Sequence, residues 1–173
     1  MEEEYVIGVD LGGTKILTAL SDLEGNILTK VKIPTEASKN KDVIMNNIKK
    51  TIYQVVDQSN INLDQVKGIG LGSPGPLDIK QGLILHTPNL NLDNVNIIEE
   101  LQELRPPVFL ENDANAAALA EKWFGAGQDA DDLIYITVST GIGGGIIVNK
   151  EVYHGVSDGA GEIPAGQRHP LHR

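Results

Sequence analysis

The feature that most constrains the fold is an apolar segment that ends in an acidic residue and two glycines. Residues 5–11 form a short apolar run, and residues 10–15 read Asp-Leu-Gly-Gly-Thr-Lys. Such a run predicts a buried strand that enters a tight turn at its glycines. Residues 15–20 and 27–33 are β-rich, and residues 23–26 have the composition of a turn. Three antiparallel strands are therefore predicted to open the fold.

The remaining sequence predicts helices and strands in alternation. Residues 41–59 carry apolar side chains at helical spacing, which predicts an amphipathic helix. The further predicted elements are strands at residues 66–71, 108–110, 133–138 and 145–148, a loop at residues 73–78, and helices at residues 94–104 and 114–124. The resulting order of elements, β-β-β-α-β-α-β-α-β-β, indicates an α/β fold with a mixed sheet.

The glycine turn at residues 10–15 has the chemistry of a phosphate-binding corner. Because Gly12 and Gly13 lack β-carbons, the backbone there can close on a phosphate and present its amide groups. Thr14 adds a hydroxyl group, and Asp10 can hold a hydrated Mg²⁺ ion. An ordinary hairpin turn accounts for the same residues, so both interpretations stay open at this point.

A second glycine-rich corner lies between the last two predicted strands. Residues 139–145 read Ser-Thr-Gly-Ile-Gly-Gly-Gly, and two such corners could grip a nucleotide triphosphate from both sides. A P-loop is excluded, because residues 13–15 have the wrong order for Gly-Lys-Ser/Thr. The Gly-x-Gly-x-x-Gly match at residues 70–75 is excluded as a dinucleotide site, because Pro74 and Pro76 prevent the helix that must follow.

A third motif places an acid between a predicted strand and an alanine-rich helix. Residues 111–115 read Glu-Asn-Asp-Ala-Asn, and strand ends form the usual ligand rim of open α/β sheets. Asp113 could accept a proton from a hydroxyl group there. It could also cap the helix, and the two roles are compatible. Residues 159–162, Gly-Ala-Gly-Glu, predict a flexible loop with one acidic side chain.

Composition excludes several classes of protein. Fourteen basic and twenty-four acidic residues give a formal net charge of −10, which repels phosphate backbones, so no nucleic-acid partner is expected. The chain has no cysteine and can build neither a disulfide framework nor a Cys-ligated metal site. It starts Met-Glu-Glu-Glu and has no apolar run near the roughly 18 residues of a membrane span. We therefore expect a cytoplasmic protein without a membrane partner.

Five motifs, taken in order, resemble those of the ROK family of bacterial sugar kinases and sugar-responsive repressors. They lie at residues 10–14, 73–78, 111–118, 139–145 and 159–163. The resemblance spans residues 4–163 and implies the actin-like ATPase (ribonuclease H-like) fold, with ATP and sugar in the cleft between two α/β domains. We expect a complete first domain at residues 1–113 and part of a second domain at residues 114–163. Residues 164–173 change in composition and form an anomalous tail.

The resemblance also implies roles for individual residues. Asp113 is expected to be the catalytic base, and ATP with Mg²⁺ is expected to supply the phosphoryl group. The residues expected to bind the sugar are Asn112, Glu162, Asn89 and Gly75. The residues expected to bind the nucleotide are Asp10, Gly12, Gly13 and Thr14 in the first phosphate element and Thr140 and Gly141 in the second.

The sequence departs from the family after Ile163. Family members continue with Gly-His and a Cys-rich zinc motif that contains a further sugar-binding Glu, whereas Pro164 and Ala165 stand here. Family kinases are also nearly twice this long. We therefore expect no zinc site, and no kinase activity from this truncated chain alone.

The expected function is ATP-dependent phosphorylation of a hexose, most simply glucose to glucose 6-phosphate, as in glycolysis. One alternative is an inactive sugar-binding fragment. Another is a ROK-type sugar-responsive regulator without a DNA-binding domain, because the first predicted strand already starts at Tyr5 and leaves no reader for DNA. The expected partners are a small sugar and ATP, and the full-length form is expected to be a homo-oligomer.

Overall fold

The computed structural model describes residues 3–87, 89–138, 142–156 and 158–162. The chain divides into two compact units, Met1–Asp113 and Ala114–Arg173. Within the described ranges, no helix is long and apolar enough to span a membrane.

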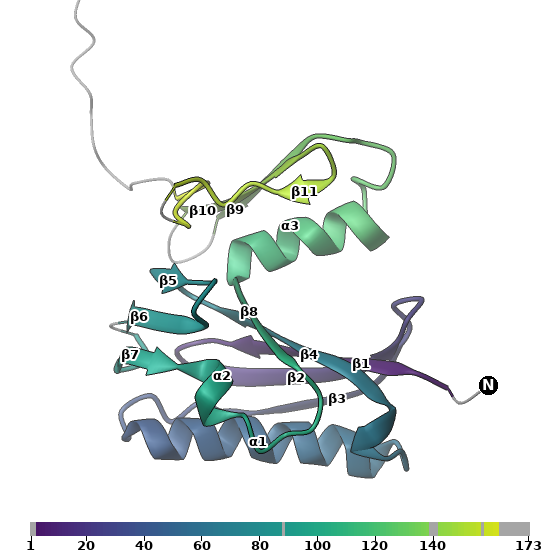
Figure 1. The fold of residues 1–173 in the computed structure, drawn as a ribbon, viewed down its shortest axis with the longest axis vertical. Helices are drawn as coiled ribbons and strands as arrows, with labels where there is room; N and C mark the ends of the chain where they lie inside the picture. The colour runs from purple at the N-terminus through teal and green to yellow at the C-terminus, as the bar shows by residue number, and fades with distance from the viewer. Residues whose placement is uncertain (1–2, 88, 139–141, 157, 163–173) are drawn as a thin grey trace, which may run out of the picture. The chain divides into compact units, whose positions relative to one another are not determined.

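The first unit is built on a five-stranded sheet with the strand order β3-β2-β1-β4-β8. Its strands are β1 (Tyr5–Leu11), β2 (Lys15–Asp22), β3 (Ile27–Pro34), β4 (Val66–Ser73), which follows the short 3-10 helix η1 (Leu63–Gln65), and β8 (Val108–Asn112). The strands β1, β4 and β8 run parallel, whereas β2 and β3 are antiparallel to their neighbours (Figure 1). The predicted antiparallel opening and the mixed sheet are confirmed.

The helix α1 (Lys41–Gln58) covers one face of this sheet (Figure 1). Its N-terminus is capped by Asn40, whose side-chain oxygen accepts a hydrogen bond of 3.1 Å from the N–H of Val43. The buried apolar side chains along the helix include Ile44, Ile48, Ile52 and Val55. Their spacing places them in one stripe against the sheet. The amphipathic helix predicted at residues 41–59 is confirmed.

The first unit also contains a small antiparallel sheet with the order β5-β6-β7. Its elements are β5 (Leu77–Asp78), β6 (Leu83–Thr87) and β7 (Leu92–Asn96), and the short helix α2 (Ile97–Glu100) follows. The helix predicted at residues 94–104 is confirmed only at residues 97–100, because residues 95 and 96 pair with β6. The Asn96 side chain accepts a hydrogen bond from the Glu99 N–H at 3.1 Å, which starts α2 only after the strand.

The second unit contains a three-stranded antiparallel sheet with the order β11-β10-β9. Its strands are β9 (Leu133–Val138), β10 (Ile142–Val148) and β11 (Glu151–Val152), and the helix before them is α3 (Asp113–Phe124). Gly145 of β10 lies against this helix, since a β-carbon there would stand 2.6 Å from the carbonyl oxygen of Ala114. The strands predicted in this region and the alanine-rich helix are confirmed, and β10 begins earlier than the sequence predicts.

Candidate active site

Most of the predicted site residues of the first unit lie at the carboxyl ends of its parallel strands or just after them. In the register of the sheet, Gly72 of β4 pairs with Asp10 of β1 on one side and with Glu111 of β8 on the other. Ser73 pairs with Asn112. The ends of β1, β4 and β8 therefore meet at one edge, which is where open α/β sheets bind ligands.

The residues Gly12, Gly13 and Thr14, named here the glycine corner, connect β1 to β2. The N–H of Gly12 donates a hydrogen bond of 3.0 Å to the carbonyl oxygen of Lys15. A β-carbon on Gly12 would lie 3.2 Å from that same oxygen. Gly12 thus closes the turn, and Gly13 and Thr14 form its tip.

The turn between β6 and β7 lies directly against the glycine corner. A β-carbon on Gly13 would stand 2.9 Å from the carbonyl oxygen of Asn89 and 3.2 Å from its β-carbon. The absence of a side chain at Gly13 is therefore a condition for this close approach. The structure brings together a residue predicted to bind phosphate and a residue predicted to bind sugar.

Asp10 lies beside the glycine corner and has a perturbed acidity. Desolvation of its carboxyl group raises its pKa, the negative charge of Asp113 raises it further, and the positive charge of Lys15 opposes both effects. Asp113 is therefore near enough to Asp10 to influence its ionisation. A divalent cation would relieve this repulsion, and carboxylate oxygen is the ligand type that Mg²⁺ prefers. The residues present fit a Mg²⁺ ion held through Asp10.

Asn112 and Asp113 stand where β8 passes into α3. The N–H of Asn112 donates a hydrogen bond of 2.8 Å to a carboxylate oxygen of the preceding Glu111. Asp113 is exposed and occupies the first position of α3. The positive end of the helix dipole favours a charged carboxylate at this position.

The other predicted site residues lie in three different settings. Gly75 follows β4 and is partly buried, in the loop that leads to β5. Glu162 belongs to the second unit, where it is exposed and its N–H donates a hydrogen bond of 3.3 Å to the carbonyl oxygen of Gly159. Thr140 and Gly141 lie outside the described residues.

Sequence reasoning missed Thr35, which follows β3 and holds the glycine corner through two hydrogen bonds to its carbonyl oxygens. Its side chain is fully buried, and its hydroxyl group donates a hydrogen bond of 2.5 Å to the carbonyl oxygen of Gly12. Its backbone N–H donates a second one, of 3.1 Å, to the carbonyl oxygen of Thr14. No local pattern could have identified this residue, because its partners lie more than twenty positions earlier in the sequence.

The described residues contain no cluster of metal-binding side chains. No group of three or more His, Cys, Asp or Glu side chains able to hold a metal ion occurs there. The whole sequence contains no cysteine, so a Cys-rich zinc motif like that of the family cannot be built from it.

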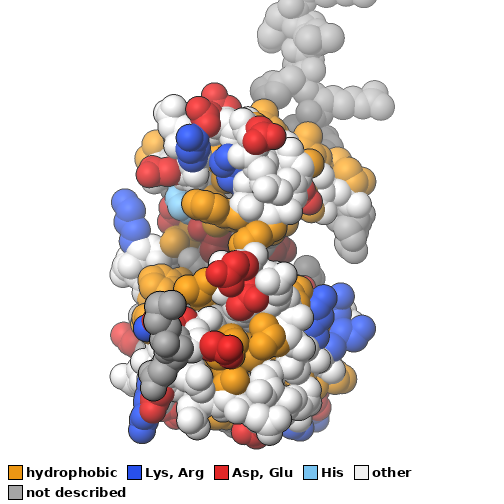
Figure 2. Space-filling view, turned by 90° about the vertical axis from the view of Figure 1, so that its right-hand side faces the viewer, with side chains coloured by type: hydrophobic (Ala, Val, Ile, Leu, Met, Phe, Trp, Pro, Cys, Tyr) orange, Lys and Arg blue, Asp and Glu red, His pale blue; other side chains and the backbone are white. Residues whose placement is uncertain are grey.

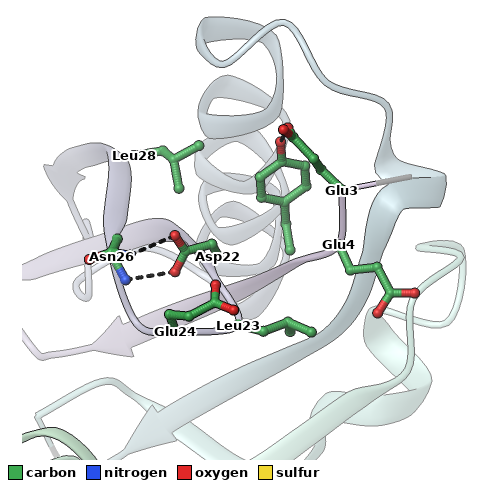
Figure 3. A pocket seen from close by; sticks show the side chains of 8 residues that line it. Glu3, Glu4, Asp22, Leu23, Glu24, Asn26 and Leu28 are labelled. Carbon is green, nitrogen blue, oxygen red and sulfur yellow. Dashed lines mark hydrogen bonds between the residues drawn. The ribbon is translucent and has the colours of Figure 1, made fainter. Parts of the chain in front are cut away.

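The first unit also has an open cavity of about 980 Å³, whose lining side chains are drawn in Figure 3. It is lined by Glu3, Glu4, Tyr5, Asp22, Leu23, Glu24, Asn26 and Leu28. The Asn26 backbone and side-chain amide groups both donate hydrogen bonds of 2.8 Å to the Asp22 carboxylate. The length of β1 separates this acidic cavity from the glycine corner by roughly 20 Å. The cavity is therefore not part of the candidate site.

Comparisons with known proteins agree with this geometry. A family model described as the ROK family matches residues 6–168. The glucokinase of Halalkalibacterium halodurans is 38% identical over 164 residues, which are 94% of this chain and 50% of the relative. The xylose repressor of Bacillus subtilis is 40% identical over 163 residues, which are 92% of this chain and 41% of the repressor.

Solved structures show the same relationship. The ROK family glucokinase from Streptomyces griseus, solved in complex with glucose and AMPPNP, matches with a TM-score of 0.81 and 37% identity. The match covers 91% of this chain and 49% of that one. This chain thus spans about half the length of the curated relatives that it matches. The expected actin-like ATPase fold is confirmed, and the chain belongs to the ROK family.

Proposed function

We propose that this chain supplies the sugar-binding and acid–base residues of an ATP-dependent hexose kinase, with glucose as the substrate. The observation that carries the proposal is the contact between Gly13 of the glycine corner and the Asn89 turn, at the edge where Asp113 also lies. Phosphoryl transfer needs the phosphate and the accepting hydroxyl group side by side, and this edge has chemistry suited to both.

In the proposed reaction, Asp113 takes the proton from a sugar hydroxyl group. The hydroxyl oxygen forms a bond to the γ-phosphorus of ATP, the bond from this phosphorus to the β,γ-bridging oxygen breaks, and its electron pair leaves with ADP. The residues that would hold the other sugar hydroxyl groups are Asn112, Glu162, Asn89 and Gly75. Asp113 does not have to form a covalent intermediate, because positioning and charge neutralisation dominate catalysis of phosphoryl transfer.

The residues that we assign to nucleotide binding are those of the glycine corner and, from the family resemblance, Thr140 and Gly141. The amide groups of Gly13 and Thr14 are suited to the oxygens of the transferred phosphate. Asp10 would hold Mg²⁺, which neutralises phosphate charge when bound. We place this activity in the cytoplasm, as a step of carbohydrate metabolism carried out by a homo-oligomer.

A second candidate function is a sugar-responsive regulator. The 40% identity to the xylose repressor of Bacillus subtilis favours it. In that case, the site residues of the first unit would bind a sugar without transferring phosphate. The two functions differ in turnover and share sugar binding, so the same sugars can test both.

The test uses the chain itself and a fusion protein that joins residues 1–162 to the C-terminal half of the Halalkalibacterium halodurans glucokinase. A panel of hexoses and N-acetylhexosamines is offered with ATP and Mg²⁺, and ADP release and sugar binding are measured separately. Phosphorylation of glucose ahead of the other sugars supports the kinase. Sugar binding without turnover in a folded fusion protein supports the regulator, and no sugar binding at all overturns both.

A further inference from the structure

We infer that Thr35 is a positioning residue for the glycine corner, an inference that rests on the proposed kinase function. Thr35 reaches the corner through two groups, its hydroxyl group and its backbone N–H. The hydroxyl group donates a hydrogen bond to the Gly12 carbonyl oxygen and the N–H donates one to the Thr14 carbonyl oxygen, at 2.5 and 3.1 Å. These two bonds set the directions in which the corner's amide groups point.

The geometry of the peptide bond explains this effect. In a planar trans peptide, the C=O and the N–H of the next residue point in opposite directions. Holding the Gly12 carbonyl toward Thr35 therefore turns the Gly13 N–H away from Thr35. Holding the Thr14 carbonyl fixes a second peptide plane, so the peptide between them, which carries the Thr14 N–H, is restrained at both ends.

The corner needs such a restraint because its own residues do little to fix the backbone conformation. Glycine has the widest conformational freedom of all residues, and two glycines stand here in succession. A phosphate site gains most from amide groups that are already oriented before the phosphate arrives. Thr35 supplies this orientation from outside the corner.

Thr35 is in turn tied to α1. Its carbonyl oxygen accepts a hydrogen bond of 3.4 Å from the side-chain amide of Asn47, and the same amide donates one of 3.1 Å to the carboxylate of Glu36. Glu36 has a φ of +58°, a left-handed conformation that is uncommon for residues other than glycine. The chain thus turns sharply just after Thr35, and Asn47 supports both residues of that turn.

The test compares Thr35→Val, Thr35→Ser and the matched control Thr18→Val in the ¹⁵N-labelled 173-residue chain. Thr18 is also fully buried and its hydroxyl group pairs with that of Thr51 at 2.7 Å, so its loss removes a comparable hydrogen bond away from the corner. ATP with Mg²⁺ is titrated, and the dissociation constant is read from the Gly13 and Thr14 amide signals. Glucose is titrated in parallel.

Thr35→Val is expected to weaken ATP binding at the corner by about tenfold, the size of one lost hydrogen bond. Thr35→Ser keeps the donor and should stay within about threefold, and Thr18→Val should bind ATP as the wild type does. Glucose affinity should not change in any of them. Asn47→Ala, a milder change at a partly exposed residue, should weaken ATP binding at the same amides by about two- to threefold.

Two results overturn the role of Thr35 alone. One is wild-type ATP affinity in folded Thr35→Val or, should that variant not fold, in Asn47→Ala. The other is equal weakening in Thr18→Val, which would show a general loosening of the fold. Failure of the wild-type corner to respond to ATP is a different outcome, because it overturns the proposed nucleotide site and the role of Thr35 with it.

Discussion

At the scale of single residues, Gly13 shows how a missing side chain can shape a site. In Gly13→Ala the new β-carbon would stand 2.9 Å from the Asn89 carbonyl oxygen, so the corner or the Asn89 turn must shift. We expect a loss of about 1–3 kcal/mol in the free energy of unfolding. The KM values for sugar and for ATP should both rise in the fusion protein.

The control for Gly13→Ala is Gly8→Ala in β1, the strand before the glycine corner, where an added β-carbon meets no atom within 4 Å. Urea denaturation and steady-state kinetics on both variants separate the close approach from the general effect of replacing a glycine. Equal KM values for sugar in both variants would show that the Asn89 turn does not depend on Gly13.

Asp113 carries the proposed chemistry, and its replacement tests that role. In the fusion protein, Asp113→Asn should lower kcat by about 10²- to 10⁴-fold, because the amide cannot accept the proton of the sugar hydroxyl group. Glucose affinity should change little, since the side chain keeps its shape. A large loss of kcat with unchanged glucose affinity would support a catalytic base. A near-normal kcat would contradict that role and leave Asp113 only a structural role at the start of α3.

Asp10 gives the first unit a pH dependence with a definite sign. Because desolvation and Asp113 raise its pKa in the folded state, the folded state holds the proton more tightly than the unfolded state. Stability then falls as the pH rises from the unfolded pKa, about 3.9, through the raised folded pKa. Asp10→Asn removes this loss, so the variant should be more stable than the wild type at pH 7 and should match it at pH 3.

Urea denaturation of the wild type and of Asp10→Asn at pH 3, 5 and 7 measures this difference. The control is Asp22→Asn, since hydrogen bonding by Asn26 lowers the pKa of Asp22. A lowered pKa stabilises the fold above the unfolded pKa, so Asp22→Asn should shift stability at pH 7 in the opposite direction. A wild type that is more stable than Asp10→Asn at pH 7 would contradict the assigned direction.

At the scale of elements, hydrophobic periodicity predicted the long and regular parts of the fold. The helix α1 has apolar side chains at helical spacing, and the strands β1, β2 and β3 are short apolar or β-rich runs bounded by turn residues. The strands β5, β6 and β7 were missed because they are short and are interrupted by Pro, Asn and Asp, which are typical of loops. The helix predicted at residues 94–104 forms only at residues 97–100, because β7 extends to Asn96, which caps the helix that follows.

The site was predictable to the extent that its motifs are local. The glycine corner and Asp113 follow predicted strands directly, and the ends of parallel strands share one edge. The support by Thr35 and the contact of Gly13 with Asn89 depend on residues far apart in the sequence. Such contacts exist only once the sheet order is known, so local patterns carry no signal for them.

The packing of α3 on β10 requires a residue without a side chain at Gly145. In Gly145→Ala the β-carbon would lie 2.6 Å from the Ala114 carbonyl oxygen and 2.7 Å from the Ala118 β-carbon. The strand must then move away from the helix, which we expect to cost about 1–3 kcal/mol or more. Gly143→Ala is the control, because the nearest atom to its β-carbon is the end of the Thr137 side chain at 3.2 Å.

Hydrogen exchange can locate the damage. In Gly145→Ala the amides of β9 and β10 should exchange faster than in the wild type, while those of β1 and β4 should keep their protection. Gly143→Ala should show a smaller effect in the same strands. Equal loss of protection in β1 and β4 would mean that the two units unfold together and that the packing of α3 on β10 has no local stability of its own.

At the scale of the whole molecule, a charged chain carries an apolar surface. The formal net charge is −10, which favours solubility. Yet Ile134, Ile136 and Val138 on one face of β9 are 70%, 57% and 76% exposed, and hydrophobic side chains are also visible on the face shown in Figure 2. Exposed apolar clusters favour association, so the two properties oppose each other.

At high protein concentration, we expect association through the apolar face of β9 to outweigh charge repulsion. Salt at 0.1 M screens the net charge beyond about 10 Å, whereas apolar contact acts at short range. The chain should therefore self-associate reversibly in sedimentation velocity runs as concentration rises. Replacing Ile134, Ile136 and Val138 together by Thr should restore a monomer, since Thr suits a strand and adds a hydroxyl group.

The matched control replaces three apolar residues by Thr: Leu23 in the turn after β2, and Ile27 and Leu28 at the start of β3. They are 52%, 52% and 47% exposed. It removes a similar apolar exposure from the first unit and should leave association unchanged. If both triple variants dissociate equally, total exposed apolar surface governs association and the face of β9 has no special part in it. If lowering the salt concentration alone yields a monomer, charge repulsion outweighs the apolar contact.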